Sequence, residues 1–177
     1  MKRYWLPLLL AATLPTLACD GGQEADAETL PEPAQSMQMM ELPDTTAQAV
    51  WSYIHEADYD GWQLWPGKGE QYEGTDPHGA LLTTYLNETA YDALTNGSGP
   101  LPNGSIVIKE NYMPDGTLAA VTVMYSAAGY DAEHNDYFWA KYQADGSVDA
   151  AGRVNSCISC HTVGDRGYLR TPYDPGM

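Results

Sequence analysis

The segment Cys157-Ile158-Ser159-Cys160-His161, near the C-terminus, constrains this chain more than any other feature. Two thiols at this spacing can each add across one vinyl group of a porphyrin, and the histidine that follows then lies under the iron as an axial ligand. A redox-active or disulfide-forming pair is the other use of such a spacing. The chain has three cysteines, and only Cys19 lies outside the motif, so no disulfide framework competes for the two thiols. The motif therefore predicts one haem c (iron) per chain, bound through Cys157 and Cys160 with His161 as the metal ligand.

The N-terminus has the pattern of an export signal. Lys2 and Arg3 precede a short apolar run from residue 5 to residue 17, which is too short to span a bilayer comfortably. The run leads into Ala18-Cys19, which is similar to a bacterial lipoprotein cleavage box, although Thr16 stands where leucine is usual. We expect residues 1–18 to be a signal peptide of lipoprotein type and a lipid on Cys19 to tether the protein to a membrane in the periplasm of a Gram-negative bacterium. Ordinary signal cleavage, which gives a soluble periplasmic protein, is the alternative.

The charge of the chain limits its partners. Residues 19–43 are rich in Glu, Asp, Ala, Pro and Gln without apolar periodicity, which predicts a flexible tether before a domain at 44–177. The net charge is −16 for the whole chain, and without Lys2 and Arg3 it is −18, from 6 basic and 24 acidic side chains. Such a surface argues against nucleic acid and anionic lipid as partners. It suits a basic periplasmic redox partner, and solubility alone is an equally good explanation.

Apolar periodicity predicts an α+β fold with an antiparallel sheet. One helix is expected to begin at a cap on Asp44 and to present Ala47, Val50, Trp51 and Ile54 on one face. Trp62 and Trp65, in a short helical or irregular piece, are expected in the core. Strands are expected at 80–86, 105–112, 118–125 and 137–142, the middle two forming a hairpin. A second helix is expected from a cap at Asn87 to Leu94, and a third, short helix carries the cysteine motif.

The late position of the motif also carries information. Only 16 residues follow His161, and the sole methionine among them is Met177. We therefore expect any sixth iron ligand, and any substrate pocket, to come from residues upstream of the motif. Four-helix gas-binding cytochromes also attach haem late, but the body of this chain shows strands rather than four long amphipathic helices.

These features together resemble the cytochrome P460 family and its relatives, the cytochromes c′-beta. The matching stretches are PHGALLTTYLN at 77–87, LPNGSIVIKENY at 101–112, DYFWAKY at 136–142 and AGRVNSCISCH at 151–161. The resemblance implies an antiparallel sheet with helices packed around one haem, often in a homodimer. It also implies that the haem iron binds or redox-transforms a small nitrogenous ligand, either nitric oxide or hydroxylamine. Whether the chain is an enzyme stays open at this stage.

The resemblance gives Lys109 a role at the haem edge, because hydroxylamine-oxidising members link a lysine at this position covalently to the porphyrin. Strand alternation puts Lys109 on the face of Val107, opposite Ile106 and Ile108, and puts Glu110 on the other face. Alternation does not say which face meets the haem, and a solvent-exposed lysine fits the pattern equally well. Burial would favour the neutral amine that such a link requires.

The distal side of the haem departs from that pattern. Hydroxylamine-oxidising members place a carboxylate over the iron as a proton acceptor, and the corresponding position falls at or near Met124, which cannot accept a proton. The position of an arginine that they use falls near Leu82. A thioether is a good haem ligand, so a non-enzymatic electron-transfer cytochrome with His161/Met124 axial ligation is the alternative function, and a gas sensor or store is a third. A purely structural role, in which Met124 fills the core, is a further alternative.

Other side chains are weaker candidates for the haem pocket. His78 and His134 are loop histidines within possible reach of the iron, whereas His55 on the first helix is expected to face solvent. Met113 is a poorer ligand than Met124 because it lies beside the turn at Pro114. Four aromatic residues of the strands, Tyr85, Tyr125, Phe138 and Trp139, fit either the pocket or the core.

Overall fold

The computed structural model describes residues 40–97 and 99–173. The predicted signal peptide, the predicted lipidation site Cys19 and the tether up to residue 39 lie outside these residues, as does Met177. The last residues of the predicted tether contact the domain, because the Pro43 carbonyl accepts a hydrogen bond of 3.1 Å from the Tyr125 hydroxyl. No helix in the described part of the chain is long and apolar enough to cross a membrane.

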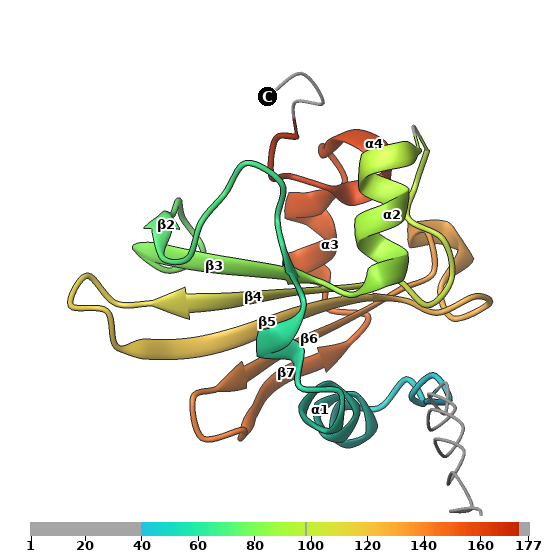
Figure 1. Ribbon diagram of the computed structural model, residues 1–177. Coiled ribbons are helices and arrows are strands. Elements are labelled where there is room, and N and C mark those ends of the chain that lie inside the picture. The colour runs from blue at the N-terminus through green and yellow to red at the C-terminus, as the bar shows by residue number, and fades with distance from the viewer. Residues whose placement is uncertain (1–39, 98, 174–177) are drawn as a thin grey trace, which may run out of the picture. The chain divides into compact units, whose positions relative to one another are not determined.

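The described residues form one antiparallel sheet of seven strands (Figure 1). Its order is β1-β3-β4-β5-β6-β7, and β2 also pairs with β3. The strands are β1 (Gln63–Leu64), β2 (Tyr72–Glu73), β3 (Leu81–Leu86), β4 (Ile106–Tyr112), β5 (Leu118–Ser126), β6 (Tyr137–Gln143) and β7 (Val148–Gly152). The register pairs Val107 with Met124 and Met124 with Trp139, so these three side chains share one face of the sheet.

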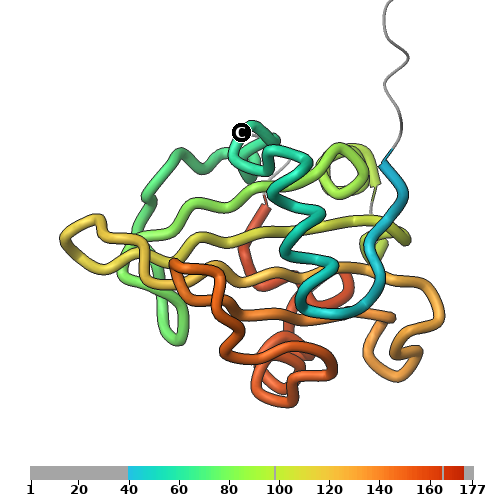
Figure 2. Tube along the Cα trace, turned by 90° about the horizontal axis from the view of Figure 1, so that it is seen from below, coloured from blue at the N-terminus to red at the C-terminus, as the bar shows by residue number. Residues whose placement is uncertain are grey.

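Helix α1 (Ala47–Glu56) covers the opposite face, and Figure 2 shows it crossing in front of the strands. Val50 and Ile54 are fully buried in a cluster with alternate residues of β4, β5 and β6 such as Ile108, Val123 and Phe138. The 3₁₀ segment η1 (Tyr59–Gly61) extends this layer, and η2 (Ala132–His134) lies between β5 and β6 in the chain. Because these side chains point toward α1, the alternate side chains of the same strands point to the opposite face of the sheet.

The other face is covered by α2 (Glu88–Asn96), α3 (Asn155–His161) and the irregular turn α4 (Asp165–Tyr168) (Figure 1). Ala90 and Leu94 of α2 and Ile158 of α3 are buried against Val107, Met124 and other residues of this face. The cysteine motif therefore lies directly above the central strands. This antiparallel sheet with helices on both faces confirms the predicted α+β class.

The predicted elements differ from the observed ones in several places, and the following three bear on the sheet and its cover. Thr46, not Asp44, is the N-cap of α1, and its hydroxyl accepts from the Ala49 N–H at 3.2 Å. Residues 63–64 pair with β3 as β1 in a piece expected to be helical or irregular. Strand β7 was not expected, because Val148–Gly152 has low β-propensity and becomes a strand only through pairing with β6.

Candidate haem site

Helix α3 places the three residues of the motif beside one another on the inner side of the molecule. Cys157, Cys160 and His161 are all partly buried, and the two thiols are not joined in a disulfide. The His161 Nδ1–H donates a hydrogen bond of 2.7 Å to the carbonyl oxygen of Tyr168. This bond fixes the tautomer, so the lone pair for a metal lies on Nε2. Burial lowers the pKa of His161, although the bond to Tyr168 opposes that effect, and the ring is therefore held neutral as a ligand should be.

Arg166 anchors the turn that supplies the Tyr168 carbonyl. Its guanidinium donates to the carbonyl oxygens of Leu94 at 2.7 Å and of Ala93 and Gly97 at 2.8 Å. These three oxygens lie at the C-terminus of α2, where the last helical carbonyls lack intrahelical partners, although the Ala93 carbonyl also accepts from the Gly97 N–H at 3.0 Å. Arg166 thus ties α4 to α2 and holds in place the acceptor that orients His161.

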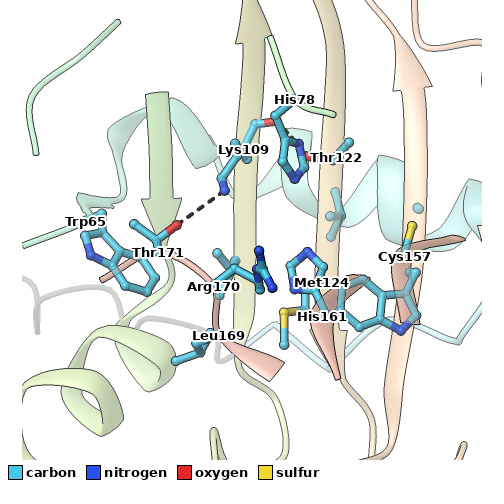
Figure 3. A pocket seen from close by; sticks show the side chains of 14 residues that line it. Trp65, His78, Lys109, Thr122, Met124, Cys157, His161, Leu169, Arg170 and Thr171 are labelled. Carbon is cyan, nitrogen blue, oxygen red and sulfur yellow. Dashed lines mark hydrogen bonds between the residues drawn. The ribbon is translucent and has the colours of Figure 1, made fainter. Parts of the chain in front are cut away.

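A pocket opens between α3, the central strands and the segment after α4, and Figure 3 shows the side chains around it. It is lined by Trp65, His78, Val107, Lys109, Thr122, Val123, Met124, Trp139, Ala140, Cys157, His161, Leu169, Arg170 and Thr171. Two further hollows, of about 220 and 400 Å³, adjoin this pocket of about 70 Å³, and all three have His78 and His161 in their walls. Cys160 lines both outer hollows. The space around the His161 ring is therefore reached from several sides.

Lys109 projects from β4 into this pocket toward the segment after α4. Its Nζ donates a hydrogen bond of 3.3 Å to the Thr171 hydroxyl, drawn as a dashed line in Figure 3. Burial lowers the pKa of Lys109 from its ordinary value of 10.5 to about 8. A substantial fraction of the amine is therefore neutral at mildly alkaline pH, which is the form that can act as a nucleophile.

His78 lies across the pocket from His161. The two ring centroids are 6.4 Å apart and the ring planes cross at 87°. In Figure 3 the His78 ring points toward the His161 ring. Burial and, to a lesser extent, the charge of Lys109 lower the pKa of His78 to about 4, so this ring is neutral at physiological pH.

Positive charge gathers around this space in a strongly acidic chain. Four of the six lysines and arginines among the described residues line the three hollows, namely Lys68, Lys109, Lys141 and Arg170. The Trp139 indole N–H is buried in the pocket wall and has no hydrogen-bond partner among the described residues. A haem carries two carboxylates and an apolar ring, so the cations, the free indole donor and the apolar walls fit such a group.

The structure brings most of the predicted site residues together. Cys157, His161, Lys109 and Met124 line the central pocket, and Cys160 lines the hollows beside it. Lys109 shares its face with Val107, and Glu110 points the other way, where it accepts hydrogen bonds from Tyr59 at 2.9 Å and Tyr112 at 2.5 Å. Cys19 lies outside the described residues.

The structure decides one open question about the pocket and corrects one expectation. Among the four candidate aromatic residues, only Trp139 lines the pocket, whereas Tyr85, Tyr125 and Phe138 belong to the core cluster under α1. The expectation that the pocket comes only from upstream residues fails, because Leu169, Arg170 and Thr171 follow the motif. No residue pattern marks these three, since only the turn at α4 folds them back over the sheet.

The remaining candidate residues do not line the central pocket. Leu82 lines the outer hollow that also contains Lys68. Met113 is half exposed, and His55 is exposed on α1, as expected. His134 bonds to Asp131 at 3.0 Å and does not line the pocket.

Comparison with protein families gives one match. The family model described as cytochrome P460 matches residues 56–168, which include the sheet, α2, α3 and the whole cysteine motif. No curated protein matches the sequence. The matched residues are those that build the pocket, apart from its last three.

Proposed function

Since the chain belongs to the cytochrome P460 family of haem cytochromes, we propose that it is a periplasmic c-type monohaem cytochrome whose iron binds or redox-transforms a small nitrogenous ligand. The observation that carries this proposal is the geometry of His161. Its Nδ1–H is committed to the Tyr168 carbonyl, and its Nε2 is left free beside two unpaired thiols and an apolar pocket. This is the arrangement that a haem-ligating histidine requires.

The following residues would hold the haem. Cys157 and Cys160 form the two thioether links, and His161 binds the iron. Lys109 bonds or polarises the porphyrin edge, and the positive charge around the pocket offsets that of the haem carboxylates. The haem itself supplies the redox chemistry, and the protein controls access and polarity around it.

The walls of the pocket favour binding of nitric oxide over oxidation of hydroxylamine. Oxidising a ligand with N–H bonds needs a base within reach. None of the residues that line the central pocket is an aspartate or glutamate. Glu73 and Asp76 line only the outer hollow of about 220 Å³, and the buried Glu110 lies on the opposite face of the sheet. Met124 occupies the wall near the expected position of the carboxylate.

A non-enzymatic electron-transfer cytochrome is the second candidate function. Met124 is 6% exposed and lines the pocket that contains His161, which supports a thioether ligand on the iron. In this case the iron would exchange electrons without taking up an external ligand.

We also propose that the protein is exported and anchored by a lipid on Cys19. The support is the sequence pattern of Lys2, Arg3, the apolar run and Ala18-Cys19. Metabolic labelling with a radioactive fatty acid tests the anchor, with a Cys19→Ala variant as the control. Label on the wild-type protein and none on the variant is the expected result, and label on neither would leave a soluble periplasmic protein.

Titration of the reduced, haem-loaded protein with nitric oxide tests the proposed ligand chemistry. We expect the haem absorption bands to change with a stoichiometry of one nitric oxide per haem. Hydroxylamine with an artificial electron acceptor should give slow turnover at most, because the pocket lacks a carboxylate base. Bands that stay unchanged at saturating nitric oxide would support the electron carrier instead.

A further inference from the structure

We propose that His78 is the second axial ligand of the haem iron and that an external ligand reaches the iron only by displacing it. The inference rests on the proposed function, because it takes His161 as the first axial ligand. It also replaces Met124 with His78 as the residue that closes the sixth position.

The first argument is the tautomer of His78. The Asn111 amide nitrogen donates to the carbonyl oxygens of Lys109 at 2.7 Å and Ala120 at 3.2 Å. The orientation of that amide is thereby fixed, and its oxygen must accept the 2.9 Å hydrogen bond from His78. The proton of His78 is therefore on Nδ1, and the lone pair on Nε2 is free for a metal. His161 is arranged in the same way by the Tyr168 carbonyl.

The second argument is the spacing of the two rings. Metal–imidazole bonds are about 2 Å long, so an iron bound between two opposed imidazoles puts their ring centroids about 6 Å apart. The centroids of His78 and His161 are 6.4 Å apart. Perpendicular ring planes are compatible with this arrangement, since both planes can contain the axis through the metal. An external ligand hydrogen-bonded to His78 would add about 2.8 Å to the separation, and the observed spacing does not provide it.

The third argument is that the loop before β3 is built to hold His78 close to the strands. A side-chain carbon on Gly79 would lie 2.6 Å from both the backbone nitrogen and the carbonyl oxygen of Tyr112, so only glycine fits there. The Gly74 N–H donates to the Ala80 carbonyl at 2.8 Å, and the His78 N–H to the Thr75 carbonyl at 3.0 Å, which close the loop on itself. His78 is therefore placed by the fold of its loop and by Asn111 together.

Met124 is less well placed than His78 for this role. Met124 pairs across the strands with Trp139, and the Trp139 ring is 4.7 Å from the His161 ring, centroid to centroid. At that separation Trp139 packs against the His161 ring with no room for a metal between them, and Met124 is its cross-strand neighbour. Met124 then fills the wall of the pocket, as methionines commonly do.

Ferric absorption and electron paramagnetic resonance spectra of the haem-loaded protein test the proposal. We expect wild type to be low-spin, with the pattern of two imidazole ligands, and His78→Ala to be high-spin. Added imidazole should return His78→Ala to the low-spin form and should bind it about tenfold or more tightly than wild type, because no internal ligand competes. His55→Ala, which removes an exposed histidine from the other face, and Met124→Leu should both keep the wild-type spectrum.

Three results would overturn the proposal while haem is present. They are a high-spin wild type, a His78→Ala variant that stays low-spin without added imidazole, and a Met124→Leu variant that becomes high-spin. A far-UV circular dichroism spectrum that matches wild type guards against a misfolded variant, since free imidazole can bind any haem whose sixth position is open. A protein that carries no covalent haem in any variant, wild type included, would overturn the proposed function itself.

Discussion

Burial changes the chemistry that Lys109 can perform. The amine lies beside Thr171 with its pKa lowered to about 8, in a pocket that also contains His161. Below that pH the amine is mainly protonated and cannot form a bond to carbon, and above it the neutral nucleophile dominates. The position of Lys109 at the pocket wall is compatible with the porphyrin link that the resemblance implies.

Replacing Lys109 with alanine tests this role. We expect the reduced wild-type protein to show a strongly red-shifted Soret band and Lys109→Ala to show the band of an ordinary c-type haem, because the extra bond to the ring is missing. Lys141→Ala is the matched control, since Lys141 lies on the same face two strands away and pairs with Asp149 at 3.1 Å. A Soret band that is identical in wild type and Lys109→Ala would remove Lys109 from the haem edge.

The sequence predicted which side chains of a strand share a face of the sheet, but not which face contacts the pocket. Alternation correctly grouped Lys109 with Val107 and separated Glu110, because side chains in a strand point to alternate faces. The same reasoning separates Phe138 from Trp139, but it cannot say which of them meets the pocket. That choice depends on which helix covers which face, and such information lies in packing between residues distant in sequence.

At the level of secondary structure, the contact between α4 and α2 decides how firmly His161 is oriented. Arg166 satisfies three carbonyl oxygens at the end of α2, and hydrogen bonds to a charged group contribute more than neutral ones. We expect Arg166→Ala to lower the free energy of unfolding by about 2–3 kcal/mol. Urea unfolding followed by circular dichroism measures this change.

Arg170→Ala is the control for that experiment. Arg170 is exposed and makes one long bond of 3.3 Å to the Cys160 carbonyl, so its loss should change stability by less than about 0.5 kcal/mol. Equal effects of the two substitutions would mean that the link between α4 and α2 does not stabilise the fold.

Asn87 connects α2 to the sheet through both ends of its amide. Its oxygen accepts from the Ala90 and Ile106 N–H groups at 3.0 Å, and its nitrogen donates to the Gly104 carbonyl at 2.8 Å. We expect Asn87→Ala to destabilise the protein by about 2 kcal/mol or more, as the loss of a cap and of two further bonds requires. Thr46→Ala removes only the single cap bond of α1 and should lose about 1 kcal/mol. If Thr46→Ala and Asn87→Ala lowered the free energy of unfolding equally in the same urea titration, the hydrogen bonds from Asn87 to the sheet would make no net contribution to stability.

The elements that the sequence revealed are those with strong local signals. The cap at Asn87 and the hairpin of β4 and β5 were predicted because an N-cap side chain and a Pro-Asp-Gly turn act within a few residues. Strand β7 was missed because its residues have little β-propensity of their own and are held by β6. The cap of α1 was misplaced by two residues, since Asp44 and Thr46 are both good caps.

Across the whole molecule, acidic side chains outnumber basic ones, and four of the six described cations surround the pocket. The net charge of −18 that remains without Lys2 and Arg3, from 6 basic and 24 acidic side chains, should therefore steer cationic redox partners toward the protein and repel anionic ones. We expect reduction by a cationic complex to slow by about tenfold or more as ionic strength rises from low to high, because salt screens the attraction. Reduction by an anionic complex should accelerate over the same range.

Stopped-flow kinetics with a neutral reductant provide the control, since its rate should not depend on salt. If the cationic and anionic reagents showed the same salt dependence, the overall charge would have no influence on partner choice, and the acidic surface would serve solubility alone.

The covalent attachment of one porphyrin through Cys157 and Cys160 is the claim on which the whole account depends. The protein should be produced in a host that matures c-type cytochromes, unfolded in acid to remove any unlinked haem, and weighed as an intact chain. We predict that the mass of wild type exceeds that of the triple variant Lys109→Ala/Cys157→Ala/Cys160→Ala by one haem after allowance for the three substitutions, and that any lipid on Cys19 adds equally to both masses. A bare polypeptide mass for wild type would contradict the account.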